Sequence, residues 1–95
     1  MPLVIERAAG EDFYVGQERF VVASIESPTA FTLRRDVDGK MFHVVDGTPR
    51  EIAASIRISV GSRGQNALAR ISIEAPRTIR VLRGELYRSQ NPGST

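Results

Sequence analysis

Alternation of apolar and polar side chains with a period of two restricts the fold of this chain more than any other feature, and it is clearest over residues 69–88. Ile71 and Ile73 alternate there with three polar residues, which is the pattern of a strand with one buried face. Pro76 cannot donate a backbone hydrogen bond to a neighbouring strand, so the pairing should break there. The run 78–83 then supplies β-branched and apolar residues. We therefore expect two strands on either side of Pro76.

Similar β-prone runs recur along the rest of the chain, separated by turn signals. They are Leu3–Arg7, Glu11–Val15, Arg19–Ile25, Ala30–Arg35, Lys40–Val45, Ile56–Val60 and Leu68–Glu74. In the second run, Phe13 and Val15 should share one face and Tyr14 the other. Gly16 suits a hairpin turn because glycine tolerates positive φ. Residues 36–39 end in Asp-Gly between two β-prone runs, which is a strong hairpin signal.

Two short segments favour helix. Thr48-Pro49-Arg50-Glu51 has the form of a helix start, with Thr as cap, Pro at the first helical position and Glu three residues after the cap. We expect one or two helical turns there, ending by Ser55. Residues 84–88 should form another helical turn. Residues 61–66 are expected to be a loop, and 91–95 a disordered tail.

The sequence therefore predicts a mainly all-β fold of antiparallel strands with an inserted hairpin and short helices. We interpret residues 1–90 as one domain, since no internal repeat, low-complexity tract or linker interrupts them. The chain has no cysteine and therefore no disulfide or thiolate chemistry. No apolar run approaches the roughly 20 residues of a membrane span. We expect a cytoplasmic protein with no membrane partner.

The net charge of +2 is unevenly distributed. Residues 1–55 contain six Lys or Arg against nine Asp or Glu, whereas residues 56–95 contain seven Arg against two Glu. Twelve of the thirteen basic residues are Arg. Arginine suits planar, bidentate contacts with phosphate and bases. A GC-rich coding bias produces the same excess, so composition alone leaves both explanations open.

Enzymatic and metal-binding interpretations have little support in the sequence. His43 lies near three aspartates, but aspartates in turns are explained by local backbone hydrogen bonds, and strand packing or surface placement accounts for the histidine. Gly61 and Gly64 have the spacing of a phosphate-binding GxxG loop, yet they lie between strands, which favours a simple hairpin connection. No serine elbow, metal-ligand spacing or Walker-type loop is present. We expect no enzyme, cofactor, metal or small-molecule substrate.

Three segments of the chain resemble the carbon storage regulator (CsrA/RsmA) family. Residues 3–16 resemble its first hairpin, with a hydrophobic strand, an Arg, a Gly-Glu turn and a second strand ending in Gly. Residues 56–60 and 68–88 resemble the remainder, above all Ala-Arg-Ile-Ser-Ile-Glu-Ala-Pro-Arg and the following Val-Leu-Arg-Gly-Glu-Leu-Tyr. The matches cover about half of the chain in the family's order. Residues 17–55 then look like an insertion between the second and third family strands, which we expect to be a β-hairpin plus a short helix.

The resemblance implies a bacterial translational regulator that works as a homodimer with intertwined strands, forming a small β-barrel or sandwich. Family members bind GGA-containing loops of messenger leaders or small regulatory RNAs. Their RNA surface is formed by the first strand of one subunit beside the last strand of the other. Carried over, the candidate RNA-binding residues are Val4, Ile5, Arg7, Ala75, Pro76, Arg77 and Arg83. We add Arg80 from the same basic stretch, although the match does not alter its interpretation as a solvated strand residue. Arg83 should be the main contact, together with Arg7 of the partner subunit.

Three residues depart from the family pattern. Glu6 replaces a small polar residue, Leu82 stands where a polar group is frequent, and Gly84 stands where an acidic residue usually begins the helix. Each change could weaken or redirect RNA binding. The alternative function is a protein-interaction module or antagonist that dimerises with related regulators, with the insertion as its binding surface.

Overall fold

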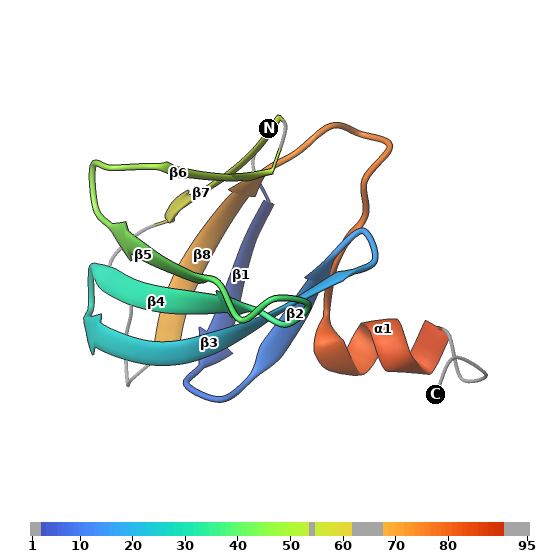
Figure 1. The fold of residues 1–95 in the computed structure, drawn as a ribbon, viewed down its shortest axis with the longest axis horizontal. Coiled ribbons are helices and arrows are strands. Elements are labelled where there is room, and N and C mark those ends of the chain that lie inside the picture. Colours follow the sequence, from blue (N-terminus) through green and yellow to red (C-terminus); the bar gives the residue numbers. More distant parts are fainter. Residues whose placement is uncertain (1–2, 54, 62–67, 91–95) are drawn as a thin grey trace.

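The computed structural model describes residues 3–53, 55–61 and 68–90, which form two antiparallel sheets and one short helix (Figure 1). The first sheet has the order β1 (Leu3–Ala8), β8 (Leu68–Glu74), β7 (Ile56–Val60) and β6 (Arg50–Ala53). The second has the order β5 (Met41–Val45), β4 (Ala30–Arg35), β3 (Glu18–Ser27), β2 (Asp12–Val15) and β9 (Val81–Arg83). Helix α1 (Gly84–Gln90) follows β9 directly. The mainly β prediction is confirmed, and the described strands form no closed barrel.

The core lies between the two sheets and is built from the alternation read in the sequence. The fully buried side chains include Phe13, Phe20, Val22, Phe31, Leu33 and Val44 from the second sheet and Ile58, Ile71 and Ile73 from the first. Ile71 and Ile73 face the core as expected. Ser72 points the other way but is also buried, because β8 is flanked by β1 and β7. Burial of this apolar surface supplies the main favourable term in folding.

The hairpins predicted at Gly16 and at residues 36–39 are confirmed, whereas the first hairpin expected over residues 3–16 is wrong, because β1 pairs with β8 in one sheet and β2 pairs with β3 and β9 in the other. β2 pairs with β3 across the turn that begins at Gly16, whose φ is +63°. β4 pairs with β5 across residues 36–40, where the Asp38 carboxylate accepts hydrogen bonds from the Lys40 backbone N–H and the Arg35 guanidinium. Hydrogen bonding from Arg35 lowers the pKa of Asp38 to about 2.

The helix predicted from Thr48 to Ser55 is wrong, because Arg50–Ala53 form strand β6. Thr48 makes a bridge with Val45, and Arg50 and Glu51 pair with β7. Ile52 is buried in the core. A helix of one or two turns is marginal by itself. Pairing with β7 satisfies backbone groups and buries Ile52, so it prevails over the local helix signature.

The second strand-like run of the basic segment is shorter than predicted. Thr78 and Ile79 belong to a turn in which the Ile79 N–H donates to the Pro76 carbonyl, and only residues 81–83 are strand. The expected helix after Arg83 is confirmed and extends to Gln90. The loop expected over residues 61–66 lies outside the described residues except for Gly61, and so does the tail expected over residues 91–95.

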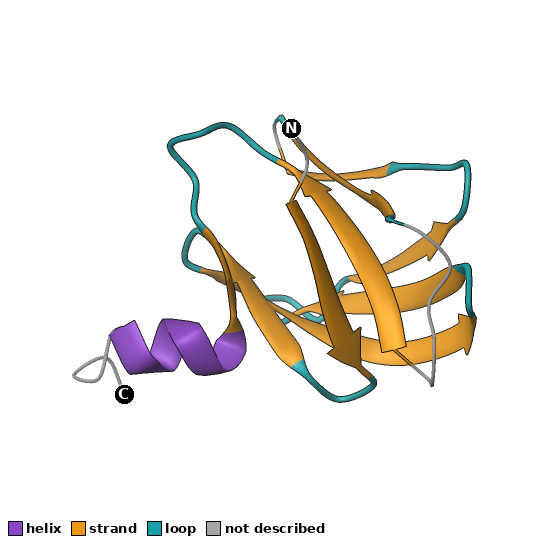
Figure 2. Cartoon of the chain, turned by 180° about the vertical axis from the view of Figure 1, so that it is seen from behind, coloured by secondary structure: helices purple, strands orange, loops and turns teal. Residues whose placement is uncertain are grey.

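The stretch 17–55 contains β3, β4, β5 and β6. Because three of these strands belong to one sheet and one to the other, the stretch is part of the common core. Seen from behind, α1 projects beyond the sheets on one side (Figure 2). Among the described residues, no helix is long and apolar enough to cross a membrane.

Candidate nucleic-acid interface

The residues predicted to bind RNA lie on two edge strands and on the connection that leads to one of them. β1 ends the first sheet and carries Val4, Ile5 and Arg7; β9 ends the second sheet and carries Arg83. Ala75, Pro76, Arg77 and Arg80 lie on the connection between β8 and β9. β1 and β9 therefore belong to different sheets of the same chain.

On β1, the side chains alternate between the core and solvent. Ile5 and Arg7 are buried, with 6% and 7% of their surface exposed, whereas 41% of Val4 is exposed. At the end of the strand, the Ala8 N–H donates to Glu11 Oε1 at 2.7 Å, and the Glu6 carbonyl accepts from Arg7 Nε at 2.8 Å. Two outward backbone groups of β1 are thus already bonded to side chains.

Arg7 connects β1 to α1. Its Nη1 and Nη2 donate to the two carboxylate oxygens of Glu85 at 2.8 and 3.1 Å, and Nη1 also lies 3.3 Å from the Asp12 carbonyl. A bidentate pair of this kind fixes geometry as well as charge. The hydrogen bond from Arg7 lowers the pKa of Glu85. An RNA phosphate would therefore reach Arg7 only by replacing Glu85.

Asp12 is a buried carboxylate between two further arginines. Its Oδ2 accepts from Arg19 Nε at 2.7 Å and from Arg88 Nη1 at 2.9 Å. Burial raises the pKa of the Asp12 carboxyl, but the hydrogen bonds from Arg88 and Arg19 outweigh burial and leave the pKa below its ordinary value. Together with the Arg7–Glu85 pair, this contact attaches α1 to the strands.

Gly84 explains one departure from the family pattern. A Cβ atom at this position would lie 1.8 Å from Asp12 Oδ1. No real Cβ tolerates such a contact, so an acidic residue could not begin α1 here while Asp12 keeps its place.

Three arginines around β9 are exposed to solvent. Arg77, Arg80 and Arg83 are exposed, and none has an ion pair within 4 Å among the described residues. Arg83 nevertheless lies close enough to Glu85 to help lower the pKa of that carboxyl. In contrast, Arg7 and Arg88 are engaged with carboxylates.

Arg83 of β9 and Arg80, which directly precedes the strand, lie on different faces. Arg83 pairs with Phe13, and Leu82 pairs with Tyr14. Since neighbouring strand residues point to opposite faces, Leu82 and Arg80 share the face of Tyr14, whereas Arg83 lies on the other face. The sequence placed these arginines in one basic stretch but did not separate them in this way.

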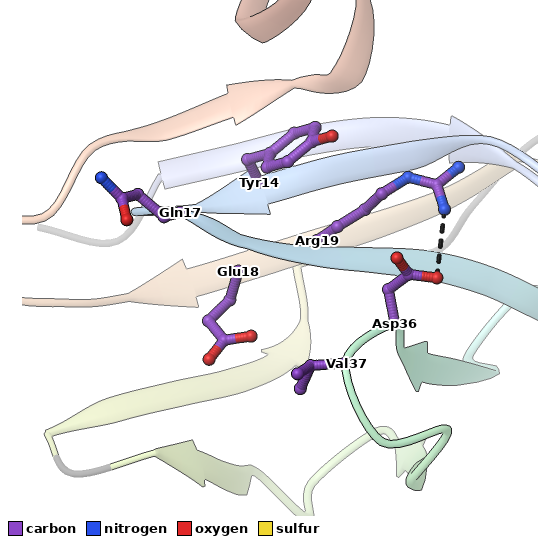
Figure 3. Close-up of a pocket in the computed structure, with 6 residues that line it drawn as sticks. All are labelled: Tyr14, Gln17, Glu18, Arg19, Asp36 and Val37. Atoms are coloured by element: carbon purple, nitrogen blue, oxygen red, sulfur yellow. Dashed lines mark hydrogen bonds and ion pairs between the residues drawn. The ribbon is translucent and has the colours of Figure 1, made fainter. Parts of the chain in front are cut away.

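Tyr14 and Tyr87 stack on the outer face, with ring centroids 3.7 Å apart and planes 8° from parallel. A shallow groove beside Tyr14 is shown in Figure 3 and includes Glu18, Arg19 and Asp36. Arg19 Nη1 lies 3.3 Å from Asp36 Oδ1, so the cation in this groove is already paired. The carboxylates make the groove a poor site for an anion.

His43 lies on the exposed outer face of β5, which agrees with surface placement. Its Nδ1 is 3.1 Å from Thr32 Oγ1 and 3.4 Å from Glu26 Oε1. In the part of the chain that the structure describes, no three His, Cys, Asp or Glu side chains gather in a group that could hold a metal ion.

Comparisons with known proteins leave the family open. No protein-family model matches the chain, and searches of curated proteins and of solved structures found no match. The resemblance to carbon storage regulators therefore rests on the residues quoted above.

Several contacts at this interface were not predicted from the sequence. They are the Arg7–Glu85 pair, the cluster of Asp12 with Arg19 and Arg88, and the stack of Tyr14 on Tyr87. Their partners are remote in sequence, up to 78 positions apart for Arg7 and Glu85. The sequence held one signal of the aromatic stack. The strand pattern placed Tyr14 on the outer face, where an aromatic ring is expected to pack against another side chain.

Proposed function

We propose that the protein is a dimeric RNA-binding regulator of translation, of the carbon storage regulator type, that recognises GGA-containing loops of messenger leaders or small RNAs. The observation that carries the proposal is that Arg77, Arg80 and Arg83, on and next to the edge strand β9, are all exposed and have no ion pair among the described residues. Within the described part of the chain, no carboxylate forms an ion pair that an anion would have to displace at these three guanidinium groups.

The chemistry of an open strand edge fits single-stranded RNA. Unpaired backbone N–H and C=O groups can hydrogen-bond to the edges of splayed bases, while arginines contact phosphates. In the proposal, Arg83 and Arg77 contact phosphate, and Ala75 and Pro76 border the path of the RNA. Val4 offers an exposed apolar side chain at the edge of β1. Ile5 supports that strand from the core. Arg7 can contact RNA only if its ion pair with Glu85 is broken.

The dimer is part of the proposal because both relevant strands lie at sheet ends. β1 and β9 each have one strand partner, β8 and β2, among the described residues. An edge strand can add a strand from another chain. Contact between β1 of one subunit and β9 of its partner would bring Val4 beside Arg83 of the second copy. The other two sheet ends, β5 and β6, are joined by a short turn and the Val45–Thr48 bridge.

A mobility shift with a GGA stem-loop tests the proposal. We expect wild type to prefer this RNA to a loop changed away from GGA, and Arg83→Ala to lose most of the binding. The matched control is Arg57→Ala. Arg57 is exposed, has no ion pair among the described residues, and lies on β7, which β8 separates from β1 in the other sheet.

The salt dependence of binding to the GGA stem-loop gives a second test. Log K should fall with log salt by about 0.7 per phosphate contacted on single strands, and Arg83→Ala should reduce the slope by about that amount. Equal binding of both loops by wild type would contradict the proposal and leave the alternative, a protein-interaction module that dimerises with related regulators.

A further inference from the structure

A second groove lies on the face of β9 opposite to Arg83. It has a volume of about 290 Å³ and is lined by residues of the β2–β3 turn, the connection before β9, β9 itself and α1. The side chains that define its chemistry are Gln17, Thr78, Ile79, Arg80, Leu82 and Tyr87.

The lining of this groove combines an aromatic ring with apolar, polar and cationic groups. Tyr87 presents a ring, and Ile79 and Leu82 present apolar surface. The Gln17 amide can both donate and accept hydrogen bonds, as can the Thr78 hydroxyl. Arg80 adds the positive charge, and none of the described residues that line the groove is a carboxylate. This combination suits a planar heteroaromatic group with an anion attached.

The groove beside Tyr14 provides a contrast within the same molecule. Glu18 and Asp36 line it, and its arginine is held by Asp36 and Asp12. A nucleotide would place phosphate near two carboxylates there. Of the two grooves that meet at Gln17, only the one beside Tyr87 combines an aromatic wall with an arginine that has no described ion pair.

Tyr87 is positioned before any ligand arrives. Its ring is stacked on Tyr14 at 3.7 Å. A side chain already held in place loses little conformational freedom on binding, which favours affinity. Stacking of a base on an aromatic side chain is tolerant of base identity, because every base has a π face.

We propose that this groove binds one unpaired nucleobase of the RNA, stacked against Tyr87, with Arg80 on the adjoining phosphate. The inference rests on the proposed RNA-binding function and extends it to the second face of β9. The RNA follows the edge of β9, with phosphates on the side of Arg83 and a single base turned over the edge into the groove. Leu82, which departs from the polar residue frequent in the family, then supplies apolar contact for that base.

An abasic scan of the RNA loop tests this assignment. Stem-loops that lack one base at a time, in and next to the GGA loop, are titrated against wild type, Tyr87→Leu, Arg80→Ala and the control Arg57→Ala, with fluorescence anisotropy as the readout. Loss of the stacked base should weaken wild-type binding about tenfold. In Tyr87→Leu the same loss should cost less than twofold, because the stack is already gone.

Arg80→Ala keeps the test sound if Tyr87→Leu is poorly folded, since Arg80 is exposed and has no ion pair among the described residues. It should weaken binding of the intact loop severalfold and lower the salt slope by about 0.7, whereas Arg57→Ala should do neither. The groove assignment alone would be overturned by the following result. Wild type binds the intact loop tightly, removal of a base weakens binding equally in wild type and Tyr87→Leu, and Arg80→Ala has no effect. Failure of wild type to bind the intact GGA loop would overturn both proposals.

Discussion

Gly84 and Asp12 constrain each other at the start of α1. Alanine favours a helix over glycine by about 1 kcal/mol, so Gly84→Ala would stabilise an ordinary helix. Here the added Cβ would meet Asp12 Oδ1 at 1.8 Å. Steric exclusion should outweigh helix propensity at this residue.

We therefore expect Gly84→Ala to lower the free energy of unfolding by about 1–3 kcal/mol. Urea denaturation of Gly84→Ala, Asp12→Ala and the double variant measures the effect. In the Asp12→Ala background the alanine at position 84 should cost little, because the carboxylate that it meets is absent. Additive losses in the double variant would show that another contact is responsible.

The carboxylates of Asp12, Asp38 and Glu85 have a lowered pKa in the folded protein. The unfolded chain therefore binds protons at higher pH than the folded chain does. The stability that these groups contribute is fully present above about pH 4 to 5. It is lost as the pH falls through the folded-state values, which reach about 2 for Asp38.

We expect the free energy of unfolding to decline as the pH is lowered from 5 to 2, and Asp12→Asn to flatten this decline. Urea denaturation at a series of pH values measures both. Asp46→Asn is the matched control, because Asp46 is an exposed aspartate with no ion pair among the described residues. An unchanged pH profile in Asp12→Asn would contradict the assigned role of the arginine contacts.

At the scale of the element, α1 depends on the strands to which it is attached. A helix of seven residues is too short to be stable alone. Glu85 contacts Arg7 of β1, Tyr87 stacks on Tyr14 of β2, and Arg88 contacts Asp12. These contacts place the helix beside β9 and thereby shape both faces of the candidate interface.

Glu85→Gln tests how this attachment affects RNA binding. The substitution removes a negative charge near Arg83 and weakens the hold on Arg7. We expect RNA affinity to rise by up to about fivefold, since an exposed charge pair makes only a modest contribution. Anisotropy titrations at low and high salt measure the change, with Glu51→Gln on β6 as control. A fall in affinity would mean that the Arg7–Glu85 pair is needed for the shape of the site.

At the scale of the whole molecule, the arrangement of the sheet ends bears on assembly. β1 and β9 each carry one unpaired edge among the described residues, and Leu3 and Val4 expose apolar side chains along β1. Edges of this kind favour pairing with another chain unless they are covered.

Sedimentation at micromolar concentration should therefore give twice the chain mass of 10.5 kDa. Val4→Lys, which adds a charge to the exposed face of β1, should shift the protein towards the monomer. Met41→Lys on β5, at another sheet end, is the matched control and should remain dimeric. A monomeric wild type would remove the composite surface on which the proposed site depends.

Local patterns in the sequence predicted the strands with clear alternation, the two hairpins and the helix after Arg83. Each depends on residues close in the chain, such as Phe13 and Val15 on one face of β2 or Asp38 beside Lys40. The segment 48–53 was mispredicted because its helix signature is local, whereas its pairing with β7 and the burial of Ile52 come from the assembled fold.

The residues of the candidate site also fall into those that the sequence predicted and those that only the structure placed. The sequence by itself determined that arginines gather at 77, 80 and 83 beside a strand, because composition and alternation are read along the chain. Only the tertiary structure decided that Arg7 is buried against Glu85, that Arg80 shares a groove with Leu82 while Arg83 lies on the other face of β9, and that Tyr87 stacks on Tyr14. These outcomes depend on which distant segments become neighbours, and no local propensity contains that information.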